Sequence, residues 1–318
     1  MAIASSIVDL IGNTPLLALD RFASGCGGRI VGKMEVFNPI SIKDRPVWSM
    51  ITRAEERGDI KPGDILVEAT SGNTGMALTY IGSMRGYQVQ IFMSEAQSVE
   101  RRHVLAALGA NIVLTPKSEG TKGARDRAIA FAESAKEATG KDAFYLCQHH
   151  NLDNRRAHFE TTGPELWDSS EGAVDSLVSG LGTCGTLCGV SAFIKAKKPS
   201  FHAVGVEPTG AALISKGEWA PHGIMGTSPG FIAENLDRDL VDEVCTVTEQ
   251  EAYAACRELA AKEGILVGIS SGANAHVARK LAQRPEFAGK LIACIIADTG
   301  ERYLSVPGLF SDASGKNS

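Results

Sequence analysis

The sequence predicts a two-lobed, three-layer α/β fold in which mostly parallel sheets are flanked by helices. Short apolar runs typical of buried strands alternate with helical patterns of ten or more residues along most of the chain. This alternation is typical of parallel sheets joined by right-handed crossovers. A length of 318 residues is compatible with about two domains. The glycines, 34 in all, gather where a predicted strand meets the next helix.

The first lobe is predicted over residues 36–150 and is expected to be the mobile one. Before it, residues 4–20 are predicted to form a short helix, a Gly-Asn-Thr-Pro turn and a strand. The periodicity then predicts helices and strands in alternation. They are strand 29–37, helix 44–57, strand 65–69, helix 76–85, strand 88–93, helix 98–108, strand 111–115, helix 122–139 and strand 144–147.

The second lobe is predicted to combine residues 1–35 with residues 151–318. Its start, 151–157, is polar and is interpreted as an irregular link. Residues 208–235 contain five glycines and three prolines, which predicts a long functional loop. The remaining predicted elements are helix 161–167, strand 176–179, helix 186–196, strand 202–206, strand 243–247, helix 249–263, strand 266–268, helix 272–283 and strand 290–297.

Composition argues against several functional classes. The net charge of −5 without a basic cluster argues against nucleic-acid binding. The seven cysteines are scattered, odd in number and contain no CxxC pair, which fits reduced thiols in a cytoplasmic protein. Residues 1–20 have no basic n-region, and the apolar runs are too short for a membrane helix. Cys184 and Cys188 lack further metal-ligand partners, so no metal site is expected.

One lysine occupies a position that favours chemistry. Pro39 ends the preceding strand, Ser41 is a candidate N-cap, and Lys43 is then expected in the first turn of the next helix. The positive end of a helix disfavours the ammonium form, which lowers the pKa and suits Schiff-base chemistry. On local sequence alone, a solvated surface lysine is the commoner interpretation.

Two junctions share one design and predict anion binding. Residues 68–76 and 179–186 each run from a buried strand through a Gly/Ser/Thr loop into a helix N-terminus. Backbone N–H groups and the helix dipole favour an anion there. Small residues that merely permit tight turns are the alternative explanation. A third junction, 267–273, carries serines that can cap a helix or meet a heteroaromatic nitrogen.

A competing interpretation is an NAD-dependent dehydrogenase. The second loop contains Gly180-x-Gly182-x-x-Gly185, and Glu207 closes the following strand 22 residues later. This arrangement matches the dinucleotide-binding fingerprint. The fingerprint is weak by itself, and a dehydrogenase leaves Lys43 and the first loop without a role.

As an ordered set, the motifs resemble fold-type II pyridoxal-phosphate enzymes, which are tryptophan synthase β-like. Within them the chain resembles the cysteine synthase (O-acetylserine sulfhydrylase) and cystathionine β-synthase group. The resemblance extends from about residue 5 to 310. The matching segments are 11–16 (IGNTPL), 38–45 (NPISIKDR), 68–75 (EATSGNTG), 161–165 (TTGPE), 182–186 (GTCGT), 268–273 (GISSGA) and 298–305 (DTGERYLS).

The resemblance implies a role for each candidate residue. Lys43 would form a Schiff base with pyridoxal 5'-phosphate, and Asn73 would hydrogen-bond the 3′ oxygen of the cofactor. Ser270 would meet its pyridine nitrogen. The phosphate would lie on Gly182, Thr183, Cys184, Gly185 and Thr186. The carboxylate of the amino-acid substrate would be bound by Thr70, Ser71, Thr74 and Gln148.

The implied reaction is β-replacement through an α-aminoacrylate intermediate, which forms L-cysteine from O-acetyl-L-serine and sulfide. Lys43 would move the α-proton. Cysteine desulfhydrase, cystathionine β-synthase-like and O-phosphoserine sulfhydrylase activities stay open within the same chemistry. The resemblance also implies a homodimer and binding of the C-terminal tail of serine acetyltransferase in the active site.

Three departures from the family pattern concern selectivity. Cys184 stands where the family commonly has glycine, and Pro229 stiffens a segment that is usually a glycine-rich gate. His149 and His150 follow Gln148 in place of the commoner Phe-x-Asn pattern. These positions are expected to affect the choice of substrate rather than the choice of cofactor.

Overall fold

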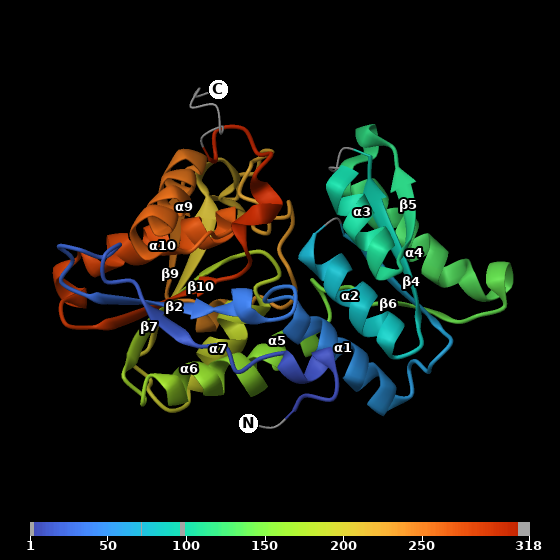
Figure 1. The fold of residues 1–318 in the computed structure, drawn as a ribbon, viewed down its shortest axis with the longest axis horizontal. Coiled ribbons are helices and arrows are strands. Elements are labelled where there is room, and N and C mark those ends of the chain that lie inside the picture. The colour runs from blue at the N-terminus through green and yellow to red at the C-terminus, as the bar shows by residue number, and fades with distance from the viewer. Residues whose placement is uncertain (1–2, 71, 96–98, 311–318) are drawn as a thin grey trace. The chain divides into compact units, whose positions relative to one another are not determined.

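The computed structural model describes residues 3–70, 72–95 and 99–310, and many of its helices and strands are labelled in Figure 1. The backbone divides into two compact units. The first combines Met1–Ile11 with Lys43–Asn154, and the second combines Gly12–Ile42 with Arg155–Ser318. These bounds differ from the predicted lobes in three places. Residues 1–11 and 151–154 belong to the first unit, and residues 36–42 belong to the second.

The first unit is a parallel four-stranded sheet between two layers of helices. Its strand order is β5-β4-β3-β6. Ile65 and Phe92 face α4, whereas Leu66 and Val89 face α2, because successive strand residues point to opposite faces. The elements are η1 (Ile7–Leu10), α1 (Asp44–Arg57), β3 (Ile65–Ala69), α2 (Asn73–Met84), β4 (Gln88–Ser94), α3 (Val99–Leu108), β5 (Asn111–Thr115), η3 (Lys117–Glu119), α4 (Gly120–Thr139) and β6 (Ala143–Tyr145).

The second unit contains a six-stranded sheet in the order β1-β2-β10-β7-β8-β9. All neighbours are parallel except β1 and β2. The strands are β1 (Leu16–Ala18), β2 (Arg29–Met34), β7 (Val174–Gly180), β8 (His202–Pro208), β9 (Glu243–Val247) and β10 (Leu291–Ile296). The helices are α5 (Asp153–Ala157), which spans the boundary between units, α6 (Gly163–Ser169), α7 (Gly185–Lys195), α8 (Leu213–Lys216), α9 (Glu249–Glu263) and α10 (Ile269–Ala282).

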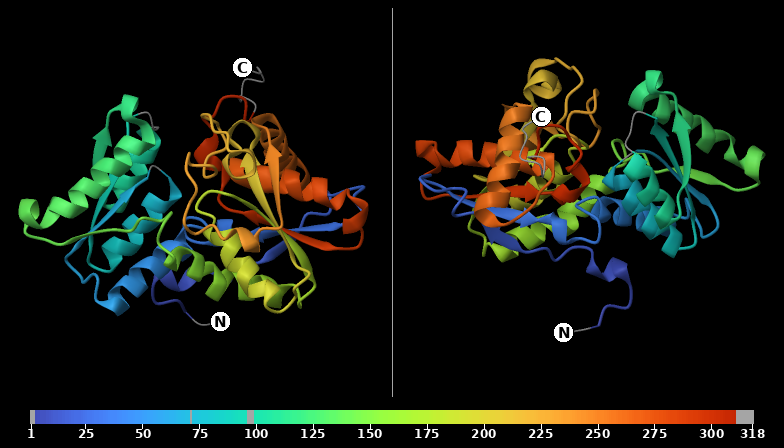
Figure 2. Two further views of the ribbon diagram at one scale, coloured as in Figure 1. Left: turned by 180° about the vertical axis from the view of Figure 1, so that it is seen from behind. Right: turned by 45° about the horizontal axis from the view of Figure 1, so that its top comes forward.

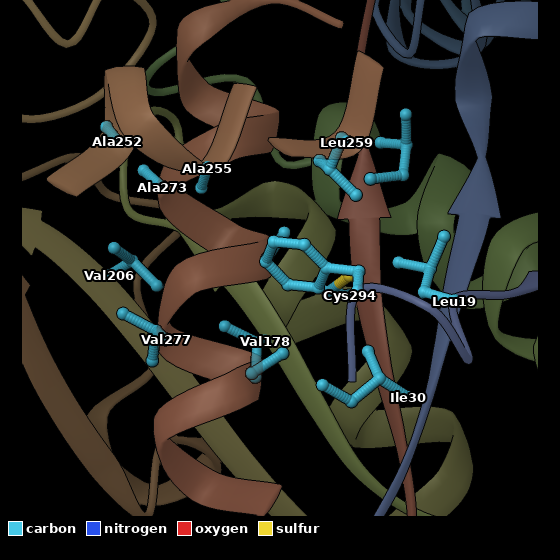
Figure 3. Close-up of a cluster of buried hydrophobic side chains, with 14 of the residues drawn as sticks. Leu19, Ile30, Val178, Val206, Ala252, Ala255, Leu259, Ala273, Val277 and Cys294 are labelled. Atoms are coloured by element: carbon cyan, nitrogen blue, oxygen red, sulfur yellow. The ribbon is translucent and has the colours of Figure 1, made fainter. Parts of the chain in front are cut away.

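Two apolar clusters cover the two faces of this sheet. Val178 and Val204 join the cluster beneath α9 and α10, which Figure 3 shows. Their chain neighbours Leu177 and Ala203 join the cluster on the side of α6 and α7. Figure 2 shows the same two helical layers from two further directions. The structure therefore confirms the predicted α/β class with mostly parallel sheets.

Some predicted bounds are wrong for identifiable reasons. Strand 29–37 ends at Met34, because the buried carboxylate of Glu35 turns the chain into η2 (Glu35–Phe37) by accepting bonds from the Thr14 hydroxyl and the Asn38 amide. The segment 151–157, predicted irregular, contains the whole of α5. A π-helical turn, η4 (His158–Thr162), links α5 to α6.

The second unit differs from prediction in two further places. The predicted strand 266–268 is a single bridge between Val267 and Thr299, because α10 already begins at Ile269. The long loop 208–235 carries η5 (Thr209–Ala211) and α8. The remaining short turns are η6 (Arg238–Leu240), η7 (Pro285–Phe287) and η8 (Gly300–Tyr303). Within the described ranges, every helix is too short or too polar to cross a membrane.

Candidate active site

Lys43 occupies the N-cap of α1 in the first unit. The helix begins at Asp44, as predicted, so Lys43 is its N-cap rather than a residue of its first turn, and Ser41 is not the cap. The Lys43 carbonyl accepts the Val47 N–H at 3.2 Å. Its side chain is partly buried. Burial and then the nearby charge of Lys43 lower the pKa of His149 to about 4, so His149 is neutral at pH 7.

The predicted carboxylate loop follows β3 and leads into α2. Thr70 Oγ1 accepts the Gly72 N–H at 3.3 Å, and Asn73 is the first residue of α2. Thr74 Oγ1 donates to Gln148 Oε1 at 2.8 Å, so the structure brings two of the predicted substrate residues together. Ser71 lies outside the described residues.

Glu68 lies beneath this loop and is a residue to which the sequence assigned no role. Its side chain is buried, and Gln148 and Ala69 donate backbone N–H groups to its two oxygens at 3.2 and 3.0 Å. Burial raises the pKa of Glu68 to about 7, against the lowering effect of these hydrogen bonds. In the local sequence, only its position next to the glycine loop motif indicates that Glu68 belongs to the site.

The predicted phosphate loop connects β7 to α7 in the second unit. A Cβ on Gly182 would lie 2.1 Å from the Gly226 carbonyl oxygen, so only glycine fits there. Cys184 is the N-cap of α7 and has a φ of +63°. The Gly185 N–H approaches Thr183 Oγ1 at 3.5 Å. The loop thus presents hydroxyl groups and the first N–H groups of an 11-residue helix, which suits an anion.

A buried histidine supports the predicted phosphate loop. His158 hydrogen-bonds with Thr186 Oγ1 at 3.2 Å and with Thr162 Oγ1 at 2.9 Å, one contact from each ring nitrogen. His158 belongs to the π-helical turn η4, and such turns are frequent at functional sites. His158 was not among the residues predicted for the site. The local signal for it is the TTGPE motif at residues 161–165, whose Thr162 lies four residues downstream.

Ser270 lies in the first turn of α10. It is partly buried, and the neighbouring Ser271 Oγ accepts the Ala297 N–H at 2.9 Å. A Cβ on Gly268 would be 2.1 Å from Asp298 Oδ1, so glycine is required where the chain enters the helix. A Cβ on Gly180 would lie 3.6 Å from Asn274 Oδ1, which places the start of the phosphate loop against α10.

The acidic residue of the dinucleotide fingerprint has a structural role. Glu207 is buried and accepts hydrogen bonds from the Ile214 N–H at 2.7 Å and from the Ser215 N–H and hydroxyl at 3.0 and 2.9 Å. Its carboxylate thereby anchors α8 to the end of β8. Because both oxygens are engaged, the geometry does not favour recognition of a ribose by this residue.

Comparisons with known proteins match almost the whole chain. The family described as "Pyridoxal-phosphate dependent enzyme" matches residues 7–298. Cysteine synthase A of Escherichia coli strain K12 is 46% identical over 311 residues, which cover 95% of this chain and 94% of that protein.

Solved structures agree with this match. O-acetylserine sulfhydrylase isoform 3 from Entamoeba histolytica superimposes with a TM-score of 0.91 at 38% identity and covers 99% of this chain and 94% of that one. O-ureido-L-serine synthase superimposes with a TM-score of 0.89 at 40% identity and covers 96% and 95% of the two chains.

Proposed function

We propose that this chain, which belongs to the pyridoxal-phosphate-dependent enzyme family, is a cysteine synthase that forms L-cysteine from O-acetyl-L-serine and sulfide. Its cofactor is accordingly pyridoxal 5'-phosphate. The proposal rests on the similarity to cysteine synthases along nearly the full length of the chain. The observation within the site that supports it most is the grouping of Lys43 and His149 with the Thr74–Gln148 pair.

The residues of each unit fit this cofactor. In the second unit, the Thr183 and Thr186 hydroxyls and the N-terminus of α7 would bind the phosphate, and no carboxylate interrupts residues 182–186. The Ser270 hydroxyl would meet the pyridine nitrogen as a neutral partner. In the first unit, Lys43 would hold the cofactor through its amine, and Asn73 would hydrogen-bond its 3′ oxygen. When bound, the cofactor supplies the electron sink for the Cα carbanion.

Residues of the chain would bind the substrate and transfer the proton. Thr70, Ser71, Thr74 and Gln148 would bind the substrate carboxylate and thereby orient its Cα–H bond. The Lys43 amine would take the Cα proton, acetate would leave Cβ with the bonding electrons, and hydrosulfide would add to Cβ. Lys43 would then return the proton to Cα. His149 is neutral at pH 7 and therefore adds no positive charge beside the Lys43 amine.

A spectroscopic titration tests the function. The purified protein is expected to show a visible absorbance band, and O-acetyl-L-serine is expected to shift it before sulfide restores it and L-cysteine appears. Lys43→Ala should lose the lysine-linked band, and steady-state turnover should fall by at least about a thousandfold, because base and covalent attachment are removed together. A Lys43→Ala protein that turns over normally without added amine would contradict the assignment.

The same titration separates the alternative substrates. His149, Pro229 and Cys184 depart from the family pattern at positions expected to affect selectivity, and the chain is also similar to an O-ureido-L-serine synthase. O-phosphoserine, cysteine and serine, added separately, distinguish sulfhydrylase, desulfhydrase and cystathionine β-synthase-like chemistry. A colourless protein that binds NAD would instead support the dehydrogenase interpretation.

The family resemblance further supports a cytoplasmic homodimer whose active site binds the C-terminal tail of serine acetyltransferase. The seven scattered cysteines, all within the described ranges, form no disulfide, which agrees with a reducing compartment. Light scattering of the purified protein should give twice the chain mass of 33.6 kDa. A monomeric mass would argue against the dimer, and a tail peptide that leaves the cofactor spectrum unchanged would argue against that partner.

A further inference from the structure

We infer that Glu68, in its ionised form, is a positioning residue that holds Gln148 in the orientation needed to bind the carboxylate of the amino-acid substrate. The inference rests on the proposed function, because it assigns Gln148 to the substrate. It assigns to this buried carboxylate an effect exerted through Gln148 and not on the reacting atoms themselves. Its effect should therefore be seen in substrate affinity more than in the chemical step.

The contacts of Glu68 join two segments that lie 80 residues apart. Its Oε1 accepts the Ala69 N–H at 3.0 Å at the end of β3, and its Oε2 accepts the Gln148 N–H at 3.2 Å just after β6. The Cys147 N–H and the Tyr145 hydroxyl are further hydrogen-bond donors. Cys147 has a φ of +53°. Successive N–H groups around such a left-handed residue form a concave anion site, and here the anion is the Glu68 carboxylate.

Gln148 is fixed at three atoms. Glu68 holds its backbone N–H, Asn154 Nδ2 donates to its backbone carbonyl at 2.8 Å, and Thr74 Oγ1 donates to its side-chain oxygen at 2.8 Å. Because the amide oxygen faces Thr74, the donating NH2 end is directed away from that hydroxyl. A donor held in this way suits a substrate carboxylate.

Protonation of Glu68 would undo this arrangement. A neutral carboxyl places an O–H donor among N–H donors and loses the charge that strengthens their bonds. Burial raises the pKa of Glu68 to about 7, so this change falls within the working pH range. The groups around it are Tyr145 and Cys147 from β6 and the segment after it, Arg125 of α4 beside Tyr145, and the apolar Ile91 opposite on β4.

The test measures binding of L-serine, whose hydroxyl is a poor leaving group, through the shift of the cofactor band between pH 6 and 8. In the native enzyme, protonation of Glu68 alone should raise the dissociation constant by up to about tenfold as the pH falls from 8 to 6, as expected for an essential ionised group with a pKa near 7. Glu68→Gln should bind L-serine about fivefold more weakly at pH 8 and should lose the part of the pH dependence that Glu68 contributes. The KM for O-acetyl-L-serine should rise, with kcat within about twofold of native.

Asp64→Asn is the matched control. Asp64 is a buried carboxylate that precedes the same strand at its opposite end and accepts the Lys61 N–H at 2.9 Å. This variant should keep the native pH dependence, and Glu68→Asp should keep part of it. The inference is overturned if Glu68→Gln binds L-serine with the native affinity and pH profile. An enzyme whose band responds to no amino acid would instead refute the proposed function.

Discussion

At the scale of single residues, Cys184 is held in a backbone conformation that L-amino acids avoid. Its φ of +63° lies in the left-handed region, and its side chain is buried with Sγ 3.8 Å from the Gly182 carbonyl. This conformation costs a residue with a Cβ on the order of 1 kcal/mol. Cys184, which stands where the family commonly has glycine, therefore introduces local backbone strain into the candidate phosphate loop, and the fold tolerates this strain.

Replacing Cys184 by glycine tests this strain. Cys184→Gly should be more stable than Cys184→Ala by about 1 kcal/mol in the free energy of unfolding, because alanine keeps the Cβ while both variants lose the thiol. Denaturant titration of the two apoproteins measures the difference. An alanine variant of equal or greater stability would show that position 184 carries no such strain.

The pKa values of Glu68 and His149 are set by the surroundings of these residues in the fold. Both have ordinary sequence contexts, yet burial shifts the pKa of Glu68 up to about 7 and that of His149 down to about 4. Both shifts favour the neutral form, as burial does for acids and bases alike. Because the two pKa values depend on burial and on neighbours distant in sequence, local sequence does not predict them.

At the scale of elements, the candidate phosphate loop depends on close approach between two backbone segments. Leu181 is held by hydrogen bonds to Val206 on one side and Ser228 on the other, and Gly182 touches the Gly226 carbonyl. On the far side, Gly189 lets α7 approach α5, because a Cβ there would be 2.4 Å from the Arg155 carbonyl. The helix N-terminus is therefore positioned by backbone packing on both sides.

Gly182→Ala should break this packing. The added methyl group would meet the Gly226 carbonyl at 2.1 Å, so the loop must shift. We expect a loss of about 2 kcal/mol in stability and at least a tenfold weaker affinity for the cofactor, measured by denaturation and by equilibrium dialysis of the apoprotein.

Gly210→Ala is the control for that substitution. Gly210 lies in η5 of the same unit, and a Cβ there has no atom within 4 Å among the described residues. This variant should match the native protein in both measurements. Native cofactor affinity in Gly182→Ala would contradict the role given to the loop.

At the scale of the whole molecule, the cofactor should contribute to the stability of the folded chain. A ligand that binds only the folded state stabilises it in proportion to the logarithm of its concentration relative to Kd, by about 2.7 kcal/mol at a hundredfold excess over Kd. The proposed anchors lie in both units, since Lys43 belongs to the first and the phosphate loop to the second.

Removal of the cofactor should therefore lower the melting temperature by roughly 5 °C or more, as measured by scanning calorimetry. Pyridoxal 5'-phosphate should restore it. Pyridoxal without the phosphate should restore it only in part, because the phosphate loop then binds no anion. Equal rescue by both compounds would argue against that loop as the phosphate site.

Most elements of the fold were predictable because their signals are local. Helix α1 and strand β3 have their predicted bounds. The helical pattern of α1 ends at Gly58, and the apolar run of β3 ends where the threonine and glycine loop begins. The end of β2 at Met34 was not predictable, because the turn depends on Thr14 and Asn38 meeting the buried Glu35. The antiparallel pairing of β1 with β2 likewise depends on strand contacts across the chain.

The sequence alone determined the α/β class, the candidate lysine and the two glycine loops, because repeating patterns and conformationally special residues act over a few positions. Tertiary structure decided the surroundings of that site: Glu68 beneath Gln148, His158 behind Thr186, and Glu207 bound to α8 rather than directed at a ligand. The first two contacts join residues 80 and 28 positions apart, and the third depends on how the chain folds back after β8. Burial and hydrogen bonding across such separations exist only once the chain has folded, which is why no local pattern contains them.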